Sequence, residues 1–528
     1  MPVKSLFVRS PDERPTINLE PGEFSAQVSL AIEALGKLGG LYVWGGRLAV
    51  LHTLGAPSPG AIHRPASAVL IVLVDASHLI ELLSRAARFL KFDARSKDWR
   101  EADPPRRLAE AILSRGFWPS LPALHGFVEA PTLSADAKLL DATGYHAQEG
   151  IFVAASPAGF ESPPHKLTRR DAVTAIELLV KALDSFPFVD TMDEVAAVAE
   201  IITAVVRRSL ESAPLFAHSA PSPGTGKTLL ASVTSIIAVG RRPSVLSLGD
   251  DNAEAEKRLG GALLAGDPII VLDNIERPLQ GDLLCQITTE PAVRLRPLGV
   301  SSLMTVPTHS TLIATGNNLV VLGDLKRRVV LIRLDAKMER PELREFEVNV
   351  LAEVAKARAE LLRAALTIPL AYHAAGEPYI EGVPPFGGFE TWDRFVRRPL
   401  CWCGLPDPLA AAERLRDDDP DHQATREVFS AIRDIWGDRP ATASDIVGSA
   451  LETEQKMSGL FEPRYPALKD ALQVVTSEKI NSRRLGYWLK RHRDRICDGL
   501  QLRQAAPDSH AKVARWVVAS AGEAGNGG

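Results

Sequence analysis

The chain has 528 residues, of which 45% are hydrophobic, and a formal net charge of -4 at pH 7. This length is too great for one ordinary domain, and the composition excludes a largely disordered or a strongly basic chain. No uncharged run reaches the roughly 18 residues of a membrane span, and the start MPVKSLFVRSPDERPT has no apolar signal-type core. We therefore expect several globular domains, no membrane contact and a cytoplasmic location.

None of the four cysteines lies in the C-x-x-C spacing that is typical of a zinc site. This usage predicts a reduced, intracellular chain without a zinc site built on paired cysteines. We interpret Cys401 and Cys403, on either side of Trp402, as helix-packing residues.

Residues 1–170 mix β-rich runs, such as GLYVWGGRLAVLHT, with the amphipathic helical pattern SHLIELLSRAARFLKF. They predict an N-terminal α+β accessory domain that ends at a proline-rich break. Asp75 and His78 follow an apolar strand, but the paired D-x-D arrangement of two-metal chemistry is absent. We interpret both residues as structural and place no primase on this chain.

A helical lead-in is predicted over residues 171–209, with Asp171 and Asp193 as its helix caps. Short apolar strands then alternate with helices over 210–340, which is typical of a mainly parallel α/β sheet. A helical region is expected over 341–415, followed by the acidic boundary RLRDDDPDHQ. Helices and two strand-like runs in residues 422–520 suggest a C-terminal winged helix-turn-helix.

The stretch PSPGTGKT at residues 221–228 has the layout of a phosphate-binding loop between an apolar strand and a helix. Pro221 replaces the first glycine of the usual G-x-x-x-x-G-K-[ST] pattern, which stiffens the turn without removing a phosphate ligand. Lys227 is the cation expected at the β- and γ-phosphates of ATP, and Thr228 supplies a hydroxyl for Mg²⁺. The predicted nucleotide-binding residues are Pro223, Gly224, Thr225, Gly226, Lys227 and Thr228.

Two later strands end in polar residues that suit the same site. Asp273 closes the apolar run IIVLD about 45 residues after Lys227, where a carboxylate reaches the Mg²⁺ of a bound triphosphate. The strand in THSTLIATGNN ends at Asn317 and Asn318, whose amides could orient the attacking water. We interpret this register of motifs as an ATPase rather than a coincidental glycine-rich turn.

Arg327 and Arg328 precede a further strand in GDLKRRVVLIRLD. A single arginine here is as easily structural as functional. In an ATPase ring, an arginine at this place reaches the γ-phosphate of the neighbouring subunit.

With PSPGTGKT, IIVLDN, ATGNN and GDLKRRVVLIRLD, residues 195–340 resemble the AAA+ ATPases, and more narrowly the superfamily 3-like helicases of phages, prophages and integrative elements. The resemblance implies a P-loop ATPase core that uses ATP and Mg²⁺ and acts on DNA as a homo-oligomeric ring, such as a hexamer, beside a separate primase or polymerase. It assigns Lys227 and Thr228 to phosphate and Mg²⁺, Asp273 to Mg²⁺, Asn317 to a sensor, and Arg327 or Arg328 to the neighbouring subunit's nucleotide.

The residue after Asp273 departs from the family pattern. Many AAA+ motors have a glutamate there as the base that polarises water, whereas this chain has Asn274. Glu276 and Glu290 are the candidates to replace it, and Glu276 is the one we assign.

Two basic segments are candidate DNA contacts. The run AVRLRPLGVSSLMTVPT predicts a hairpin whose apparent tip, LGVSS, is uncharged, so that Arg294 and Arg296 are either DNA contacts or structural. The helical run SRRLGYWLKRHRDRI joins cations with Tyr487 and Trp488, which we expect to face the core. A solvated basic face or a protein-docking surface is the alternative interpretation of this run. Its candidate DNA-binding residues are Arg483, Arg484, Lys490, Arg491 and Arg493.

The sequence thus favours an ATP-dependent DNA helicase or translocase of a phage or mobile element, active in replication. A DNA-binding ATP switch without unwinding activity, such as an initiator, loader or defence component, is the alternative, which Asn274 favours. A catalytically inactive scaffold is a third hypothesis and predicts no ATP binding.

Overall fold

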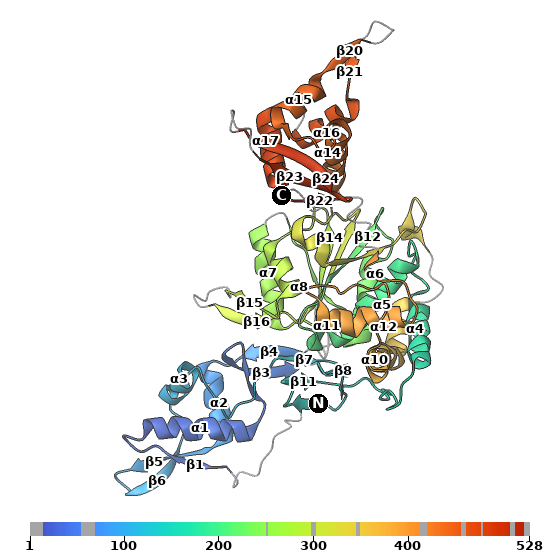
Figure 1. The fold of residues 1–528 in the computed structure, drawn as a ribbon. Helices are drawn as coiled ribbons and strands as arrows, with labels where there is room; N and C mark the ends of the chain where they lie inside the picture. The colour runs from blue at the N-terminus through green and yellow to red at the C-terminus, as the bar shows by residue number, and fades with distance from the viewer. Residues whose placement is uncertain are drawn as a thin grey trace. The chain divides into compact units, whose positions relative to one another are not determined.

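The computed structural model describes residues 14–53, 69–249, 252–296, 303–344, 349–410, 420–455, 461–476, 479–506 and 513–521. The chain divides into two compact units, Met1–Ala412 and Glu413–Gly528, which are drawn in Figure 1. Across the described part of the chain, no helix has the length and apolarity that crossing a membrane requires.

In the described residues of the N-terminal part of the first unit, three helices pack with two small sheets. The strand orders are β1-β5-β6 and β2-β3-β4. Leu35, Leu83, Leu108 and Phe89 are buried together where the helices cover the strands. The elements are β1 (Thr16–Asn18), α1 (Phe24–Leu38), β2 (Leu41–Trp44), β3 (Arg47–Thr53), β4 (Val69–Leu73), α2 (Ala76–Ala86), β5 (Arg88–Asp93), β6 (Asp98–Ala102) and α3 (Arg106–Ser114).

Asp75 has a local structural task in this region. It is the N-cap of α2, and its carboxylate accepts a hydrogen bond from the backbone N–H of His78 at 2.8 Å.

Short strands follow α3, in the order β10-β11-β7 and in the pair β8-β9. They are β7 (Gly126–Val128), β8 (Thr132–Leu133), β9 (Leu139–Leu140), β10 (Gly144–His146) and β11 (Ile151–Val153).

The two lead-in helices are α4 (Arg169–Leu183) and α5 (Thr191–Val206), with the short 3-10 helix η2 (Arg207–Ser209) after them. The prediction that Asp193 caps its helix is wrong, whereas Asp171 takes part in capping without being the N-cap residue itself. Thr168 caps α4 in a capping box with Asp171, and Asp190 caps α5. Asp193 is the third residue of α5, and its buried carboxylate accepts hydrogen bonds from the side chain and the backbone N–H of Arg333, the last residue of β18.

A five-stranded parallel sheet forms the centre of the first unit, with the order β13-β14-β17-β12-β18. The predicted mixed α/β fold with a parallel sheet is confirmed in this region. The strands are β12 (Leu215–Ala220), β13 (Ser244–Leu246), β14 (Ile269–Ile275), β17 (Thr311–Asn317) and β18 (Val329–Arg333). The helices and remaining pieces are α6 (Lys227–Val239), α7 (Asn252–Ala265), α8 (Asp282–Thr289), the hairpin β15 (Ala292–Leu295) and β16 (Met304–Pro307), and η3 (Gly323–Arg328).

The apolar runs read from the sequence are continuous rather than alternating because the central strands are covered on both faces. Phe216, Val271, Ile313 and Val330 of four adjacent strands are buried in the same core as α5 and α6. Helices further along the chain extend that core, and Trp392 is buried in it with its indole N–H donating to Thr203 at 2.8 Å. These elements are η4 (Pro341–Leu343), α9 (Val350–Lys356), α10 (Arg358–Ala374), α11 (Glu390–Trp392), a π-helix (Asp393–Arg397) and α12 (Arg398–Trp402).

In the part of the second unit that the structure describes, four helices accompany a sheet of the order β19-β24-β23-β22. Phe429, Leu472, Leu489 and Trp516 are buried in its core. The two strand-like runs expected near the C-terminus form the antiparallel pair β23 and β24. The elements are α14 (Pro420–Trp436), β19 (Ala441–Thr442), α15 (Ala443–Leu451), β20 (Thr453–Gln455), β21 (Phe461–Pro463), α16 (Pro466–Thr476), α17 (Ser482–Arg491), β22 (Ile496–Cys497), β23 (Leu500–Ala505) and β24 (Arg515–Ser520).

Candidate nucleotide and nucleic-acid sites

The motif-bearing loops meet at one edge of the sheet because the carboxyl ends of parallel strands lie together. Strand β12, which leads into the PSPGTGKT loop, lies between β17 and β18. Ala220 at its end is paired with Asn317 at the end of β17. Strand β14, which carries Asp273, is on the other side of β17.

The glycines of the loop have backbone conformations that other residues adopt only with strain. Gly224 and Gly226 have φ angles of 79° and 103°. A Cβ on Gly224 would come within 2.7 Å of the backbone nitrogen of Glu342. Helix α6 begins at Lys227, so its first N–H groups border this loop and form the kind of helix terminus that binds phosphate.

The residues before the lysine close the loop. Pro221 follows Ala220, the last paired residue of β12, and so its missing N–H removes no bond from the sheet. Pro223 is exposed, whereas Thr225 is buried and donates to the carbonyl of Ser222 at 3.3 Å. The loop is therefore closed by its own hydrogen bonds.

Lys227 is held by acceptors from both sides of the loop. Its Nζ donates to Asn317 Oδ1 at 2.8 Å, to the Ser222 carbonyl at 3.1 Å and to Thr225 Oγ1 at 3.3 Å. Burial lowers the pKa of Lys227, and the Asp273 carboxylate opposes that shift. Asn317, the predicted sensor, is therefore in direct contact with Lys227. Asn318 instead donates its backbone N–H to the Ala220 carbonyl.

Thr228 and Asp273 are brought together as the sequence predicts, and the structure adds a third group. Thr228 Oγ1 donates to Asp273 Oδ1 at 2.9 Å, and Thr315 Oγ1 donates to the same oxygen at 2.6 Å. A hydroxyl and a carboxylate are the hard oxygen donors that Mg²⁺ prefers, so this pair fits that ion. Thr315 was missed because its position next to Asp273 depends on the pairing of β14 with β17.

Asn274 occupies a bulge where the pairing of β14 with β17 shifts register. Its φ angle is 52°, a left-handed conformation that asparagine tolerates better than most residues. Its backbone N–H donates to Thr315 Oγ1, and its side-chain amide donates to Glu276 at 3.1 Å. The bulge thus brings Glu276 to the same edge as Asp273.

Glu276 is exposed and lines a cleft of about 770 Å³ together with Asp273 and Asn274. The cleft runs from the end of β14 to α7, α8 and η3. Glu290 follows the last residue of α8 and is not among the residues that line this cleft. Of the two candidate bases, Glu276 is the one placed beside the predicted Mg²⁺ ligands.

The two arginines of η3 have different surroundings. Arg328 is mostly buried and donates to the Cys285 carbonyl at 2.7 Å, to Thr289 Oγ1 at 2.6 Å and to Asp324. Arg327 has a side chain that is 61% exposed, and Asp324 is also its partner. The hydrogen bond with Asp324 raises the pKa of Arg327 and lowers that of the carboxyl. Arg328 is thus anchored to α8, whereas Arg327 faces solvent.

Arg294 and Arg296 lie at the end of the hairpin strand β15 and are both exposed. They line a second cleft, of about 560 Å³, with residues of α7 and α8. The apparent hairpin tip LGVSS lies entirely outside the described residues. A DNA contact by this hairpin remains a prediction.

A buried polar network adjoins the PSPGTGKT loop, and no motif in the sequence predicted it. His218 of β12 contacts Glu200 Oε2 of α5 at 2.6 Å and the Lys227 carbonyl at 3.0 Å. Thr234 of α6 donates to the other oxygen of Glu200 at 2.7 Å. Burial by itself lowers the pKa of His218, but Glu200 and the Lys227 carbonyl raise it, and the net direction is upward.

The network joins α5, β12 and the first residue of α6 through side chains that are fully buried. A charged residue in the apolar run VAAVAEIITAVV and a histidine in LFAHSA were the available signals. Because a buried carboxylate requires a hydrogen-bonding partner, the presence of both residues in apolar runs indicates that they contact each other.

Helix α17 carries the basic set of the second unit. Arg483, Arg484, Lys490 and Arg491 are exposed on it, and Arg493 is exposed just after it. Arg484 donates to the Thr476 carbonyl and Arg493 pairs with Asp494. Within the described residues, no partner engages the side chains of Arg483, Lys490 and Arg491.

The prediction that both aromatic residues of α17 face the core is wrong for one of them. Tyr487 is 65% exposed. Trp488 is half-buried, stacks on His492 with ring centroids 4.0 Å apart and contacts Phe429 edge-on. The core contacts of this helix are instead made by Leu485 and Leu489, which recur at the spacing of one helical turn. Tyr487 therefore lies on the surface together with the cations.

No family model matches the chain, and no curated protein matches its sequence. Among solved structures, it is similar to an apo structure of the NrS-1 C-terminal region, with 12% identity and a TM-score of 0.36 over 83% of this chain and 98% of that one. It is also similar to the SCCmec type IV Cch helicase, with 12% identity and a TM-score of 0.31 over 91% and 97% of the two chains. A third structure is JCV helicase, with 16% identity and a TM-score of 0.20 over 49% and 72%. Because these TM-scores lie below 0.5, function is inferred from the geometry of the site.

Proposed function

We propose that the chain is an ATPase that moves along or unwinds DNA, as expected of the mobile-element helicases that its motifs resemble. One observation carries the proposal: Lys227 donates to Asn317 and the adjacent Thr228 donates to Asp273, so that side chains from three segments of the sequence form a group at the carboxyl edge of a parallel sheet. Such a group beside a helix N-terminus is suited to a nucleoside triphosphate.

The chain's own residues divide the chemistry. Thr228 and Asp273 would hold Mg²⁺, which supplies charge neutralisation on the phosphates when bound. Lys227 exchanges its internal acceptors for phosphate oxygens, and this exchange releases the Asn317 amide to orient water. Glu276, beside Asp273, is the proposed base, and Arg327 is the residue that faces a neighbouring subunit in a ring.

DNA contact is assigned to the exposed cations of α17, with a priming enzyme as a separate protein. Phosphate contacts by Arg483, Lys490 and Arg491 would be independent of base sequence. Arg294 and Arg296 are the second proposed contact, through the hairpin that precedes β17.

A DNA-binding ATP switch is the second candidate function, and Asn274 favours it. The position that follows Asp273 holds an amide whose side chain donates to Glu276, so that carboxylate is engaged within the protein. A protein built in this way would bind ATP, change its DNA affinity and hydrolyse ATP slowly.

Strand displacement on a forked DNA, measured together with DNA-stimulated ATP hydrolysis, separates the two functions. We expect the wild type to do both and Lys227→Ala to do neither. Lys181→Ala is the matched control, because Lys181 is an exposed lysine of α4 that lies outside the proposed nucleotide and DNA sites. ATP binding without displacement would support the switch, and no ATP binding by the wild type would leave only a scaffold.

A further inference from the structure

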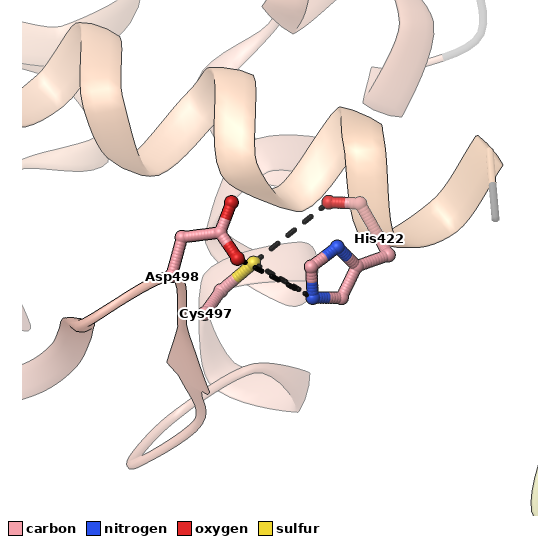
Figure 2. A group of neighbouring side chains, drawn as sticks. All are labelled: His422, Cys497 and Asp498. Atoms are coloured by element: carbon pink, nitrogen blue, oxygen red, sulfur yellow. Dashed lines mark hydrogen bonds and ion pairs between the residues drawn. The ribbon is translucent and has the colours of Figure 1, made fainter. Parts of the chain in front are cut away.

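Three side chains of the second unit converge although they come from distant parts of the sequence. His422 lies in the first turns of α14, Cys497 is the last residue of β22, and Asp498 follows it. Figure 2 shows the imidazole, the thiol and the carboxylate pointing toward one another. Cys497 Sγ is 3.5 Å from His422 Nε2, and the same nitrogen is 4.0 Å from Asp498 Oδ1.

The fold explains why the adjacent residues Cys497 and Asp498 can face one point. Asp498 and Gly499 form a two-residue hairpin turn, with φ angles of 46° and 77°, between the paired Cys497 and Leu500. An Asp-Gly pair is a preferred sequence for such a turn. The turn brings the Asp498 carboxylate round toward α14, while Cys497 is buried in the core below it.

The donor set is that of a zinc site. Thiolate, imidazole and carboxylate are the three protein ligand types that Zn²⁺ uses, and sulfur favours zinc over magnesium or calcium. With Zn–S near 2.3 Å and Zn–N near 2.05 Å, a tetrahedral centre puts S and N about 3.6 Å apart. The observed 3.5 Å between Sγ and Nε2 agrees with that spacing.

The three ligand atoms lie within 4.8 Å of one another, and the carboxylate must move closer to join the other two. Its Oδ1 lies 4.0 Å from the imidazole nitrogen, whereas about 3.4 Å is expected between two such ligands. Asp498 is 46% exposed on a turn, so the movement meets little resistance. Arg426 lies 3.6 Å from the other oxygen, Oδ2, and leaves Oδ1 directed at the imidazole.

We propose that His422, Cys497 and Asp498 bind one Zn²⁺, with the fourth position open to solvent. Binding replaces the thiol proton of Cys497, which is released to water. The ion would join the start of α14 to the β22–β23 turn, and so add to the contacts that Cys497 makes with His422 and that Arg426 makes with Asp498. Spacing rules for paired cysteines could not find this site, because it has one cysteine and its histidine is 75 residues away.

Zinc content per chain tests the proposal on the full-length protein. After loading with Zn²⁺ and removal of loose metal on a chelating resin, elemental analysis should find about one zinc per wild-type chain, and much less in Cys497→Ser and His422→Gln. Cys403→Ser, which changes a half-buried cysteine of the first unit, is the matched control and should retain the metal.

Asp498→Asn separates loss of metal binding from loss of folding, because it changes an exposed side chain. We expect its zinc affinity to fall by at least about tenfold while its circular dichroism spectrum is unchanged. Cobalt in place of zinc should give a thiolate-to-metal absorption band in the wild type that is lost in Cys497→Ser. A wild type that retains no metal, or a Cys497→Ser protein that retains as much as the wild type, would overturn the proposal and leave a thiol–imidazole hydrogen bond.

Discussion

The charged side chains at the carboxyl edge of the parallel sheet and those on the exposed face of α17 differ in whether protein partners engage them. At the sheet edge, Lys227 and Asp273 each have protein partners at hydrogen-bonding distance. On α17, no described residue engages Arg483, Lys490 or Arg491, and all three are exposed. The first arrangement would suit a ligand of fixed geometry, as the proposed nucleotide would be. The second is suited to a polyanion whose position can vary, with an affinity that salt weakens.

The arginine pair of η3 sharpens this comparison within the first unit, and the largest effect is expected there. Arg327→Ala should lower DNA-stimulated ATP hydrolysis by about a thousandfold, because the side chain would act on a neighbour's phosphate. Arg328→Ala should instead weaken the packing of η3 on α8, at a cost of about 1–3 kcal/mol, since it removes donors to Cys285 and Thr289.

Mixed assemblies test whether Arg327 acts between subunits. Lys227→Ala subunits keep their arginine, and so they should restore hydrolysis when mixed with Arg327→Ala subunits, neither of which is active alone. The assignment would be reversed if Arg328→Ala abolished hydrolysis in a stably folded protein while Arg327→Ala had no effect.

Breaking the buried network tests the preorganised side of the comparison. Glu200→Gln should reduce the unfolding free energy of the first unit by about 3 kcal/mol near pH 6, because it leaves the His218 imidazolium buried without its charge partner. The pKa of His218 is raised in the folded chain. Its stabilising contribution is therefore complete below the ordinary histidine pKa of about 6.5 and is lost as the pH rises through the raised value.

Urea unfolding at about pH 6 and about pH 9 should show a gap between wild type and Glu200→Gln that narrows at the higher pH. Glu177→Gln, a change at an exposed residue of α4, is the control and should match the wild type at both. A gap of the same size at the two pH values would show that the His218 proton is not involved.

The smallest effect is expected on α17. Arg491→Ala should weaken duplex DNA binding a few-fold and reduce the slope of log affinity against log salt by about 0.9, the value for one phosphate contact. Fluorescence anisotropy over a salt series measures both quantities. Arg464→Ala removes an exposed arginine of the same unit that is paired with Glu452, and it should leave the slope unchanged. Equal slopes for all three proteins would remove α17 from the DNA interface.

Linear patterns predicted the parts of this molecule that depend on local sequence. The strands that end near Ala220, Asp273 and Asn317 follow from apolar runs, and their convergence follows from parallel pairing. The roles assigned to these residues stay predictions. Thr315 and the Glu200–His218 pair could not be placed in this way, since they depend on strand register and on the approach of α5.

The errors have the same origin. Aspartate is a residue type that favours helix caps, but the Asp193 carboxylate forms an ion pair with Arg333, which is distant in sequence and adjacent in space. Tyr487 was assigned to the core because a short helix needs apolar anchors, yet Leu485 and Leu489 already supply them. The sequence could not separate Arg327 from Arg328 either, because only the position of α8 distinguishes an anchored arginine from an exposed one.

The left-handed conformation of Asn274 constrains how this protein could change by mutation. Installing a glutamate at this position by Asn274→Glu would place a residue with a Cβ and a long side chain at a φ angle of 52°. That conformation costs most residues about 1–2 kcal/mol, so the carboxylate would come with backbone strain or with a rearranged bulge. The same change would remove the amide that donates to Glu276. Asn274→Glu alone therefore does not give the arrangement in which the catalytic base directly follows the aspartate. At least one compensating change in the β14 bulge would also be needed.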